Sequence, residues 1–284
     1  MSRLQAPPMA AVLADVRAAL AEDIGSGDAT ADLIPPHVRA EAAVVCREDA
    51  VLAGAPWFAA CLRELDPDMA IDWQVHDGAQ VRAGSQVCRV NGQARALLSA
   101  ERSALNFLQL LSGTATTTAR HVAAVAGSGA VVLDTRKTLP GLRQAQKYAV
   151  RCGGGTNHRM GLDDAMLIKE NHIAVAGSLR AAVAAARANH PQLPLEVEVE
   201  DLRELEEALL AGVDRIMLDE FDDADIARAV ARTAGQVPLE VSGGVELERL
   251  SALARLGIDY ISIGALTKHV HAIDLSMRIH FRER

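Results

Sequence analysis

The segment from Asp134 to His172 concentrates positive charge in a chain that is otherwise acidic. It contains seven Lys and Arg residues against four Asp and Glu residues, whereas the whole chain of 284 residues has a formal net charge of -8. A cationic segment in an anionic protein predicts a site for a small polyanionic ligand. Nucleic acid would need a broader basic face, because its affinity comes from many phosphate contacts. The basic residues are Arg136, Lys137, Arg143, Lys147, Arg151, Arg159 and Lys169.

Arginines in and near this segment are suited to holding carboxylates or phosphates. Arg136 and Arg159 flank the glycine run 153–155, and Arg102 lies in the first turn of a predicted leucine-rich helix. A planar guanidinium binds an anion through two parallel hydrogen bonds, which lysine cannot reproduce. His158, beside Arg159, either donates to the same anion or caps a loop, and we favour the ligand contact.

Two other features of the basic segment have alternative interpretations. Arg143, Lys147 and Arg151 are spaced by four residues, which places them on one face of a short helix. This stripe is either a solvated face or an extension of the field that attracts the ligand. Cys152 is predicted to be a small buried side chain rather than a nucleophile.

The composition predicts a folded protein of the cytoplasm. Half of the residues are hydrophobic, which suffices for one large core or for a large core and a smaller one. No stretch approaches the roughly 20 apolar residues of a membrane span, and the N-terminal segment is typical of an amphipathic helix rather than of a secretory signal. The four cysteines form no CxxC pair, so we expect reduced thiols and no zinc cluster.

From about residue 130 onward, short β-branched runs alternate with segments of helical period. This alternation implies parallel strands with right-handed crossovers, and six such units fit a β/α barrel better than an open doubly wound sheet. A dinucleotide-binding fold would need GxGxxG after its first strand, and the sequence lacks it. The predicted strands are 130–135, 165–171, 194–200, 214–220, 238–244 and 259–265, and the predicted helices are 178–190, 201–212, 222–235 and 246–257.

The first hundred residues follow a different pattern. Short alternating runs broken by Gly and Asp predict antiparallel strands and hairpins in a separate α+β domain. The predicted helix 99–127 joins this domain to the barrel. Its leucines surround the helix, which implies burial on more than one side.

Polar or glycine-containing groups follow nearly every predicted barrel strand. The C-terminal strand ends of a β/α barrel converge on one mouth, so these residues are expected to face each other and form an active site. In chain order they are Asp134, Thr135, Arg136 and Lys137, then Lys169, Asn171 and His172, then Glu198 and Glu200, Asp219 and Glu220, Ser242 to Gly244, and Gly264.

The third predicted barrel strand carries glutamates at alternate positions. Alternation places Glu196, Glu198 and Glu200 on the face toward the barrel axis. A buried carboxylate is costly unless a cation, a metal or a hydroxyl pairs with it, and Lys137 and Lys169 are the predicted partners. The alternative is a structural ion network inside the barrel.

Glycine turns follow the last two predicted strands. Ser242–Gly243–Gly244 and Ile263–Gly264–Ala265 occupy the position where barrels often bind phosphate through backbone N–H groups. Glycine lets the backbone approach an anion closely. A single turn of this kind is also compatible with a plain tight turn, but two at successive strand ends favour a phosphate site.

Together these segments closely resemble the quinolinate phosphoribosyltransferase family. The resemblance covers most of the chain, and the block of residues 147–172 is its most specific part. Glu220 departs from the family pattern, which commonly has Asn after the Leu-Asp pair. The other matching segments are residues 22–30, 101–113, 134–143, 196–200, 216–220, 241–244 and 262–269.

The resemblance implies a fold and an activity. The fold is an N-terminal α/β sandwich domain, residues 1–100 joined by the C-terminal segment 274–284, and an irregular, incomplete β/α barrel, residues 101–273. The activity is transfer of phosphoribose from phosphoribosyl pyrophosphate to quinolinate with decarboxylation, in NAD biosynthesis. The resemblance also implies a homodimer in which Arg102 completes the partner's site. Neither nucleic acid nor a membrane is an expected partner.

The resemblance also assigns roles to individual residues. Glu198 and Asp219 contact the ribose hydroxyls, directly or through Mg²⁺, and with Lys137 and Lys169 they are the predicted catalytic residues. The predicted quinolinate ligands are Arg102, Thr135, Arg136, Lys137, His158, Arg159 and Lys169. The predicted phosphoribosyl pyrophosphate ligands are Asn171, His172, Glu198, Asp219, Ser242, Gly243, Gly244, Ile263, Gly264 and Ala265.

The reaction itself requires such a site. Cations must offset the repulsion between a dianionic acid and a polyphosphate donor, and carboxylates stabilise an oxocarbenium-like ribosyl centre. The alternatives are a phosphoribosyltransferase of the same fold with another acid substrate, or a non-catalytic protein that binds a phosphate ligand. Three candidate arginines argue against nicotinate as the acid, and the predicted catalytic groups argue against a sensor, which needs no transition-state stabilisation.

Overall fold

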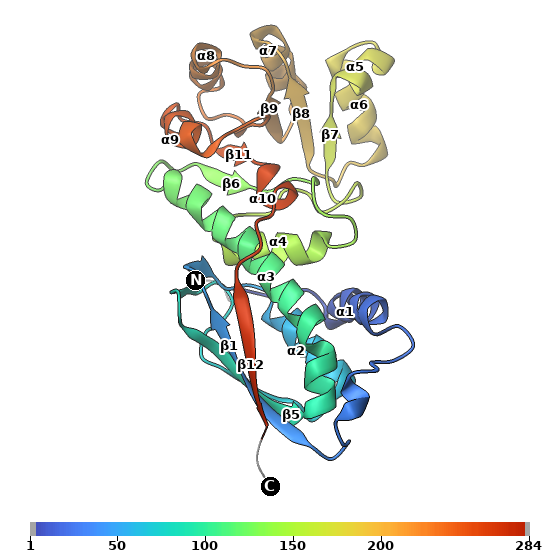
Figure 1. Ribbon diagram of the computed structural model, residues 1–284. Helices are drawn as coiled ribbons and strands as arrows, with labels where there is room; N and C mark the ends of the chain where they lie inside the picture. The colour runs from blue at the N-terminus through green and yellow to red at the C-terminus, as the bar shows by residue number, and fades with distance from the viewer. Residues whose placement is uncertain (1–3, 282–284) are drawn as a thin grey trace. The chain divides into compact units, whose positions relative to one another are not determined.

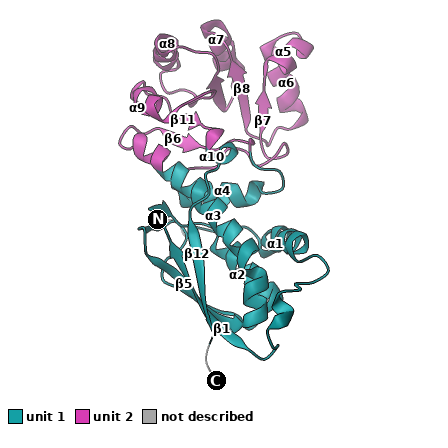
Figure 2. Cartoon of the chain, viewed as in Figure 1, with its two compact units in different colours: residues 1–119, 138–154, 266–284 teal, residues 120–137, 155–265 magenta. Residues whose placement is uncertain are grey.

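A computed structural model describes residues 4–281 of the chain, which folds into two compact units (Figure 2). Unit 1 is built from three stretches, which end at residue 119, span residues 138–154 and begin at residue 266. Unit 2 comprises residues 120–137 and 155–265. The predicted division at residues 100 and 101 lies within helix α3 (Ala94–Ala124), whereas the compact units divide that helix after residue 119.

Unit 1 contains a four-stranded antiparallel sheet in the order β12-β1-β5-β3. Figure 1 labels its strands β12, β1 and β5. Buried and exposed residues alternate along the first half of β1, so one face of this sheet enters the core. The strands are β1 (Arg39–Cys46), β3 (Ala70–Trp73), β5 (Gln86–Gln93) and β12 (Leu275–Phe281), with the separate pair β2 (Ala50–Val51) and β4 (Gln80–Val81). The helices are α1 (Met9–Ile24), the 3-10 helix η1 (Ala31–Leu33), α2 (Ala55–Leu65), most of α3, and α4 (Arg143–Cys152).

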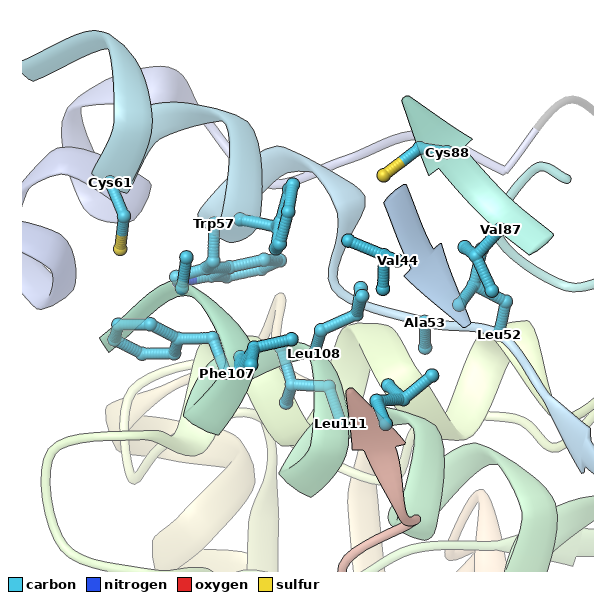
Figure 3. Close-up of a cluster of buried hydrophobic side chains, with 14 of the residues drawn as sticks. Val44, Leu52, Ala53, Trp57, Cys61, Val87, Cys88, Phe107, Leu108 and Leu111 are labelled. Carbon is cyan, nitrogen blue, oxygen red and sulfur yellow. The ribbon is translucent and has the colours of Figure 1, made fainter. Parts of the chain in front are cut away.

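The core of unit 1 forms where the helices meet this sheet (Figure 3). Trp57 and Phe58 on α2 are fully buried, and Phe58 packs edge-on against Trp73 of β3 with ring centroids 5.5 Å apart. Leu108 and Leu111 of α3 enter the same cluster. Each fully buried side chain of this size stabilises the fold by about 1.5–3 kcal/mol, so α3 is held by its apolar face.

The predicted return of the C-terminal segment to the first domain is confirmed for its described part. Strand β12 pairs antiparallel with β1 along its whole length, from Cys46 opposite Leu275 to Ala40 opposite Phe281. The last predicted residues, 282–284, lie outside the described residues.

Unit 2 is a six-stranded parallel sheet in the order β6-β11-β10-β9-β8-β7. Strands β6 and β7 are its two edges, so the barrel is incomplete, as predicted, and Thr156 adds an isolated parallel bridge beside β6. The strands are β6 (Val131–Leu133), β7 (Met166–Ile168), β8 (Leu195–Val199), β9 (Arg215–Leu218), β10 (Leu239–Val241) and β11 (Tyr260–Ser262). All six predicted strands are therefore confirmed.

Three helices of unit 2 begin at side-chain caps that their sequences provide. The side chains of Ser178, Asp201 and Asp222 each accept a hydrogen bond from the backbone N–H three residues later. Gly212 ends α7 in the left-handed conformation. The helices are α5 (Glu170–Ala176), α6 (Leu179–Asn189), α7 (Leu202–Ala211), α8 (Asp223–Thr233) and α9 (Leu247–Arg255). The short α10 (Ala265–Lys268) follows β11 and lies, from Leu266 on, in unit 1.

None of the helices described between residues 4 and 281 is long and apolar enough to cross a membrane. The four cysteines are free and buried. Cys152 is 5% exposed, which confirms the prediction of a buried side chain, and burial raises the pKa of its thiol to about 12.

Candidate active site

Most of the predicted site residues lie at or just after the carboxyl ends of the parallel strands of unit 2. His158 and Arg159 lie on the loop between the bridge at Thr156 and β7, and Arg102 lies outside this unit. Arg102 lies on α3 in unit 1, where it is exposed in a groove of about 560 Å³ between α1, α3 and the loop at residues 140–142. In a parallel sheet, strand ends of the same sense share one edge, so the unit 2 residues are gathered at a single mouth.

The ends of β6 and β11 meet at Lys137. A Cβ atom added to Gly264 would lie 2.9 Å from Cδ of Lys137 and 3.5 Å from the hydroxyl oxygen of Thr135. The Thr135 hydroxyl accepts a hydrogen bond from the Lys137 backbone N–H at 3.0 Å. Glycine at position 264 therefore leaves the room that the Lys137 side chain occupies.

The ends of β7 and β8 meet in an ion pair. The Lys169 ammonium donates directly to the Glu198 carboxylate, which confirms the predicted pairing of a strand glutamate with Lys169. The Lys169 backbone N–H donates to Nδ1 of the His172 ring at 3.0 Å. In return, the His172 backbone N–H donates to the Lys169 carbonyl at 2.8 Å. His172 thus fixes the first turn of α5 and, with it, the main chain of Lys169.

The end of β9 lies against the glycine turn after β10. A Cβ atom added to Gly243 would lie 3.2 Å from a carboxylate oxygen of Asp219. Gly243 and Gly244 both have positive φ, of 88° and 50°, a conformation that glycine adopts without steric cost. The turn therefore exposes its backbone close to the Asp219 carboxylate.

The two arginines of the basic segment are electrostatic neighbours. Burial and the charge of Arg136 lower the pKa of Arg159, and the charges of Glu196 and Asp164 partly oppose this effect. The Arg159 guanidinium also donates to the Ala165 carbonyl at 3.2 Å, so its position is fixed. Two guanidinium groups that act on each other electrostatically suit a ligand with two acidic groups.

His158 is more buried than the sequence suggested. Its Nε2 lies 2.9 Å from a carboxylate oxygen of Glu196 and 3.5 Å from one of Glu240, and its Nδ1 accepts from the Arg159 backbone N–H at 2.7 Å. Burial alone would lower the pKa of His158, but the bond to Glu196 and the charges of Glu240 and Glu196 outweigh it and raise the pKa. Protein groups thus surround both ring nitrogens, and contact with quinolinate stays a prediction.

Two functional candidates inside the barrel were missed by the sequence reasoning. Glu240 on β10 is fully buried, and its carboxylate lies 2.9 Å from the Arg215 guanidinium of β9. Arg215 in turn lies 4.1 Å from the ring centroid of Tyr260 on β11. The sequence did offer a signal for both residues, because each is the charged residue of a short strand that is otherwise apolar.

Carboxylates gather near the predicted magnesium ligands Glu198 and Asp219. Partial desolvation and the charges of Glu204, Glu170, Asp219 and Glu198 raise the pKa of Glu200. Carboxylate oxygens are ligands that Mg²⁺ accepts, and a cation would relieve this repulsion, so the donor set fits the metal.

The basic stripe at Arg143, Lys147 and Arg151 is only partly solvated. It lies on α4 in unit 1, where Lys147 is completely buried. Arg143 donates to the Thr138 hydroxyl at 3.2 Å, and Arg151 donates to the Gln5 carbonyl at 2.9 Å. The stripe is therefore not a wholly solvated face, because its middle residue is buried and the two flanking arginines are half-buried and bonded within unit 1.

The fold and the site together define an incomplete α/β-barrel protein with cationic and carboxylate groups gathered at its strand ends. Residues 28–112 match the family model described as quinolinate phosphoribosyl transferase, N-terminal domain, and residues 114–278 match its C-terminal domain. The chain therefore belongs to the quinolinate phosphoribosyltransferase family.

Individual relatives agree with this membership. The chain is 42% identical over 272 residues to a nicotinate-nucleotide pyrophosphorylase [carboxylating] of Mycobacterium leprae, covering 92% of this chain and 95% of the relative. It is 38% identical over 285 residues to a quinolinate phosphoribosyltransferase [decarboxylating] of Nicotiana tabacum, covering 93% of this chain and 81% of the relative.

Solved structures show the same fold. A nicotinate-nucleotide pyrophosphorylase from Francisella tularensis superposes with a TM-score of 0.95 at 44% identity, covering 99% of this chain and all of the other. NadC from Streptococcus pyogenes superposes with a TM-score of 0.95 at 40% identity, covering 98% of this chain and all of the other.

Proposed function

We propose that this protein transfers phosphoribose from phosphoribosyl pyrophosphate to quinolinate and releases carbon dioxide, giving nicotinate mononucleotide and pyrophosphate for NAD biosynthesis. The observation that carries the proposal is the gathering of Arg136 and Arg159 in the unit that also holds the Lys169–Glu198 ion pair. Paired guanidiniums suit a dicarboxylate, and carboxylates beside glycine turns suit a ribose phosphate. The names of the relatives support the same reaction.

On the acid side, Arg136 and Arg159 bind the two carboxylates of quinolinate. Lys137, held beside Gly264 and Thr135, and Lys169, held by the first turn of α5, add positive charge. Quinolinate must separate Lys169 from Glu198, or share it, when it binds. Because the ion pair neutralises both groups, binding of the acid exposes the Glu198 charge to the second substrate.

On the ribose side, Glu198 and Asp219 contact the hydroxyl groups, and the turns at Ser242–Gly244 and at Gly264 present backbone N–H groups to the 5-phosphate. The positive φ of Gly243 and its closeness to Asp219 support this placement. Glu198 and Asp219 would also hold Mg²⁺, directly or through water. When bound there, the metal would neutralise charge on the pyrophosphate leaving group.

The chain's own groups then account for the chemistry. As the bond from the ribose carbon to pyrophosphate breaks, the carboxylates of Glu198 and Asp219 stabilise positive charge on the ribosyl centre. The pyridine nitrogen attacks that carbon and becomes quaternary. Loss of the adjacent carboxylate as carbon dioxide leaves an electron pair on the ring carbon, which the ring cation stabilises until a proton from water replaces the lost group.

We propose further that two copies of the chain share their active sites. Arg102 is exposed and belongs to unit 1, whereas the other predicted acid-binding residues belong to unit 2 and come later in the sequence. This separation supports a role for Arg102 in a partner's site. Arg102→Ala is expected to abolish turnover without unfolding the protein. Mixing it with inactive Lys169→Ala protomers should restore part of the activity, and failure to do so after proven subunit exchange would refute shared sites.

We also propose a cytoplasmic location, which the four free, buried cysteines support because a reducing compartment keeps such thiols unpaired.

The reaction is tested by incubating the purified protein with Mg²⁺, phosphoribosyl pyrophosphate and quinolinate labelled in the carboxyl group adjacent to nitrogen. Equal amounts of labelled carbon dioxide and nicotinate mononucleotide are expected, with no turnover of nicotinate in a parallel reaction. Turnover of nicotinate, or of neither acid, would refute the proposed substrate and leave the family assignment standing.

A further inference from the structure

Four side chains form an interior charge cluster in the barrel: His158, Glu196, Arg215 and Glu240. Glu196 and Glu240 are 6% and 0% exposed, and the His158 side chain is 9% exposed. The cluster joins residues from β8, β9 and β10 to the loop that follows Thr156. The groups that face Glu240 are Glu196 on β8, Arg215 on β9, Ser262 on β11 and His158 on the loop.

Such a cluster is costly in the place where it lies. Barrel interiors are usually filled with branched apolar side chains, because burying a charge loses its hydration. A buried ion pair commonly contributes no more stability than a well-packed apolar pair of the same volume. Packing alone therefore does not explain why this interior is charged.

A metal site does not explain the cluster either. One ligand atom each from His158, Glu196 and Glu240 can be chosen so that all lie within 4.8 Å of one another. However, the Arg215 guanidinium lies 2.9 Å from Glu240, and the His158 imidazole lies 2.9 Å from Glu196. The two carboxylates already have a guanidinium and an imidazole beside them, so a divalent cation would meet repulsion from Arg215.

The cluster touches the acid-binding residues through His158. The backbone N–H of Arg159 donates to Nδ1 of His158 at 2.7 Å, and the backbone N–H of His158 donates to the buried Asp134 carboxylate at 2.9 Å. The side chain of Glu196 also acts electrostatically on Arg159. The orientation of the His158 ring is therefore linked to the main chain that carries the Arg159 guanidinium.

We propose that Glu240 is a positioning residue for the acid substrate: its carboxylate, fixed by Arg215, holds the His158 ring and thereby keeps the Arg159 main chain and guanidinium in place to bind quinolinate. The inference rests on the proposed quinolinate chemistry. By this proposal, the charged interior of the barrel contributes to the affinity for quinolinate and does not contribute to the affinity for phosphoribosyl pyrophosphate.

The first test replaces the carboxylate at constant volume. Glu240→Gln, measured at pH 8, is expected to raise the dissociation constant and the KM for quinolinate about tenfold, while kcat and the KM for phosphoribosyl pyrophosphate change less than twofold. Quinolinate binding is measured calorimetrically without the donor, so that no turnover occurs. The matched control is Glu206→Gln, which removes an exposed carboxylate that pairs with Arg232 between α7 and α8. It should change neither the dissociation constant nor the KM for quinolinate.

The effect should depend on pH. Burial first, and then the charge of Glu196, raises the pKa of Glu240 to about 7 against the opposing effects of His158, Ser262 and Arg215. At pH 6 the wild-type side chain is mostly protonated and resembles glutamine, so the difference between wild type and Glu240→Gln should shrink. A purely structural role would not produce this convergence in quinolinate affinity.

Two further variants keep the proposal falsifiable if Glu240→Gln folds poorly. Arg215→Met/Glu240→Met replaces the ion pair with apolar side chains and is expected to keep the melting temperature within a few degrees while it still weakens quinolinate binding. In a His158→Gln background, Glu240→Gln should have less than a twofold further effect, because the two residues act in series.

The outcomes separate this inference from the proposed function. If wild type neither binds nor converts quinolinate, the proposed function fails and the inference fails with it. If wild type binds quinolinate, two results would overturn the inference alone. One is unchanged quinolinate affinity in the folded Arg215→Met/Glu240→Met variant, and the other is equal loss of affinity for both substrates.

Discussion

Replacing Gly264 with alanine should displace Lys137 without unfolding the barrel. The added Cβ would lie 2.9 Å from Cδ of Lys137, whereas carbon atoms in contact prefer about 3.5–4.0 Å, so the lysine chain must withdraw by roughly 0.6–1.1 Å. The Thr135 hydroxyl, at 3.5 Å, need not move. Because the obstructing atom belongs to the flexible part of an exposed side chain, the rotamer adjustment should cost only about 1 kcal/mol of stability.

The catalytic cost should be much larger. A misplacement of about 1 Å in a substrate-binding group can reduce the rate about 100-fold, so we expect kcat/KM for quinolinate to fall about 10- to 100-fold. The measurement is labelled carbon dioxide release at varied quinolinate, with thermal denaturation of the same preparation. Gly212→Ala is the control, because it strains the left-handed end of α7 but its Cβ meets no other described atom within 4 Å. It should lose about 1 kcal/mol of stability and no activity.

A double-variant comparison isolates the mechanism. In a Lys137→Ala background the obstructing Cδ is gone, so Gly264→Ala should cause no further loss of activity. The reasoning is refuted if Gly264→Ala alone retains kcat/KM within twofold of wild type, or if its effect persists in full after the lysine has been removed.

Three other predictions concern stability. Glu220 has a φ of 59°, a left-handed conformation that Asn tolerates better than Glu. Glu220→Asn should therefore raise the free energy of unfolding, measured in urea, by about 0.5–1 kcal/mol. A lower free energy of unfolding in the variant would contradict this prediction. Asp201→Ala removes the side-chain cap of α7, a 2.8 Å hydrogen bond from the Glu204 backbone N–H. The variant should lose about 1 kcal/mol of unfolding free energy in the same assay. An unchanged urea midpoint would show that the cap does not stabilise the protein. The raised pKa of Glu240 favours its protonated form in the folded state, so its contribution to stability is complete below pH 4.5 and is lost as pH rises through about 7. The stability of wild type relative to Glu240→Gln should therefore fall by up to about 3 kcal/mol between these pH values, and a constant difference would contradict the shift.

Local patterns predicted the parts of this protein that depend on neighbouring residues. Alternating runs and capped helical segments predicted all six parallel strands and the helices α6 to α9, because period and caps act within a few residues of chain. Helix α5 was not predicted, and it begins within the predicted strand 165–171. The Lys169–Glu198 pair was also predictable, since both residues lie at the ends of strands that are adjacent along the chain. Buried Cys152 followed from its small apolar side chain and the lack of a nearby cysteine.

The positive φ of Glu220 gives a physical reason for a family pattern that the sequence showed only as a difference. Asn after the Leu-Asp pair suits a left-handed position, because its short polar side chain tolerates that conformation. Glu at the same position keeps the turn and accepts the backbone strain. The sequence revealed the substitution, and the backbone conformation explained it.

The sequence by itself determined the order of strands and helices, the residues at the strand ends and, through them, the kind of substrate that the site attracts. Only the tertiary structure decided that Lys147 is buried within unit 1, and that Glu240, Arg215 and His158 form one cluster inside the barrel. These contacts join residues that are 25 or more positions apart, and the charge of a side chain does not specify its partner. The partners are set by burial in a shared interior, because a buried charge is stable only beside a group of opposite charge or a hydrogen-bonding group. The packing of the strands determines which of these groups lies within reach.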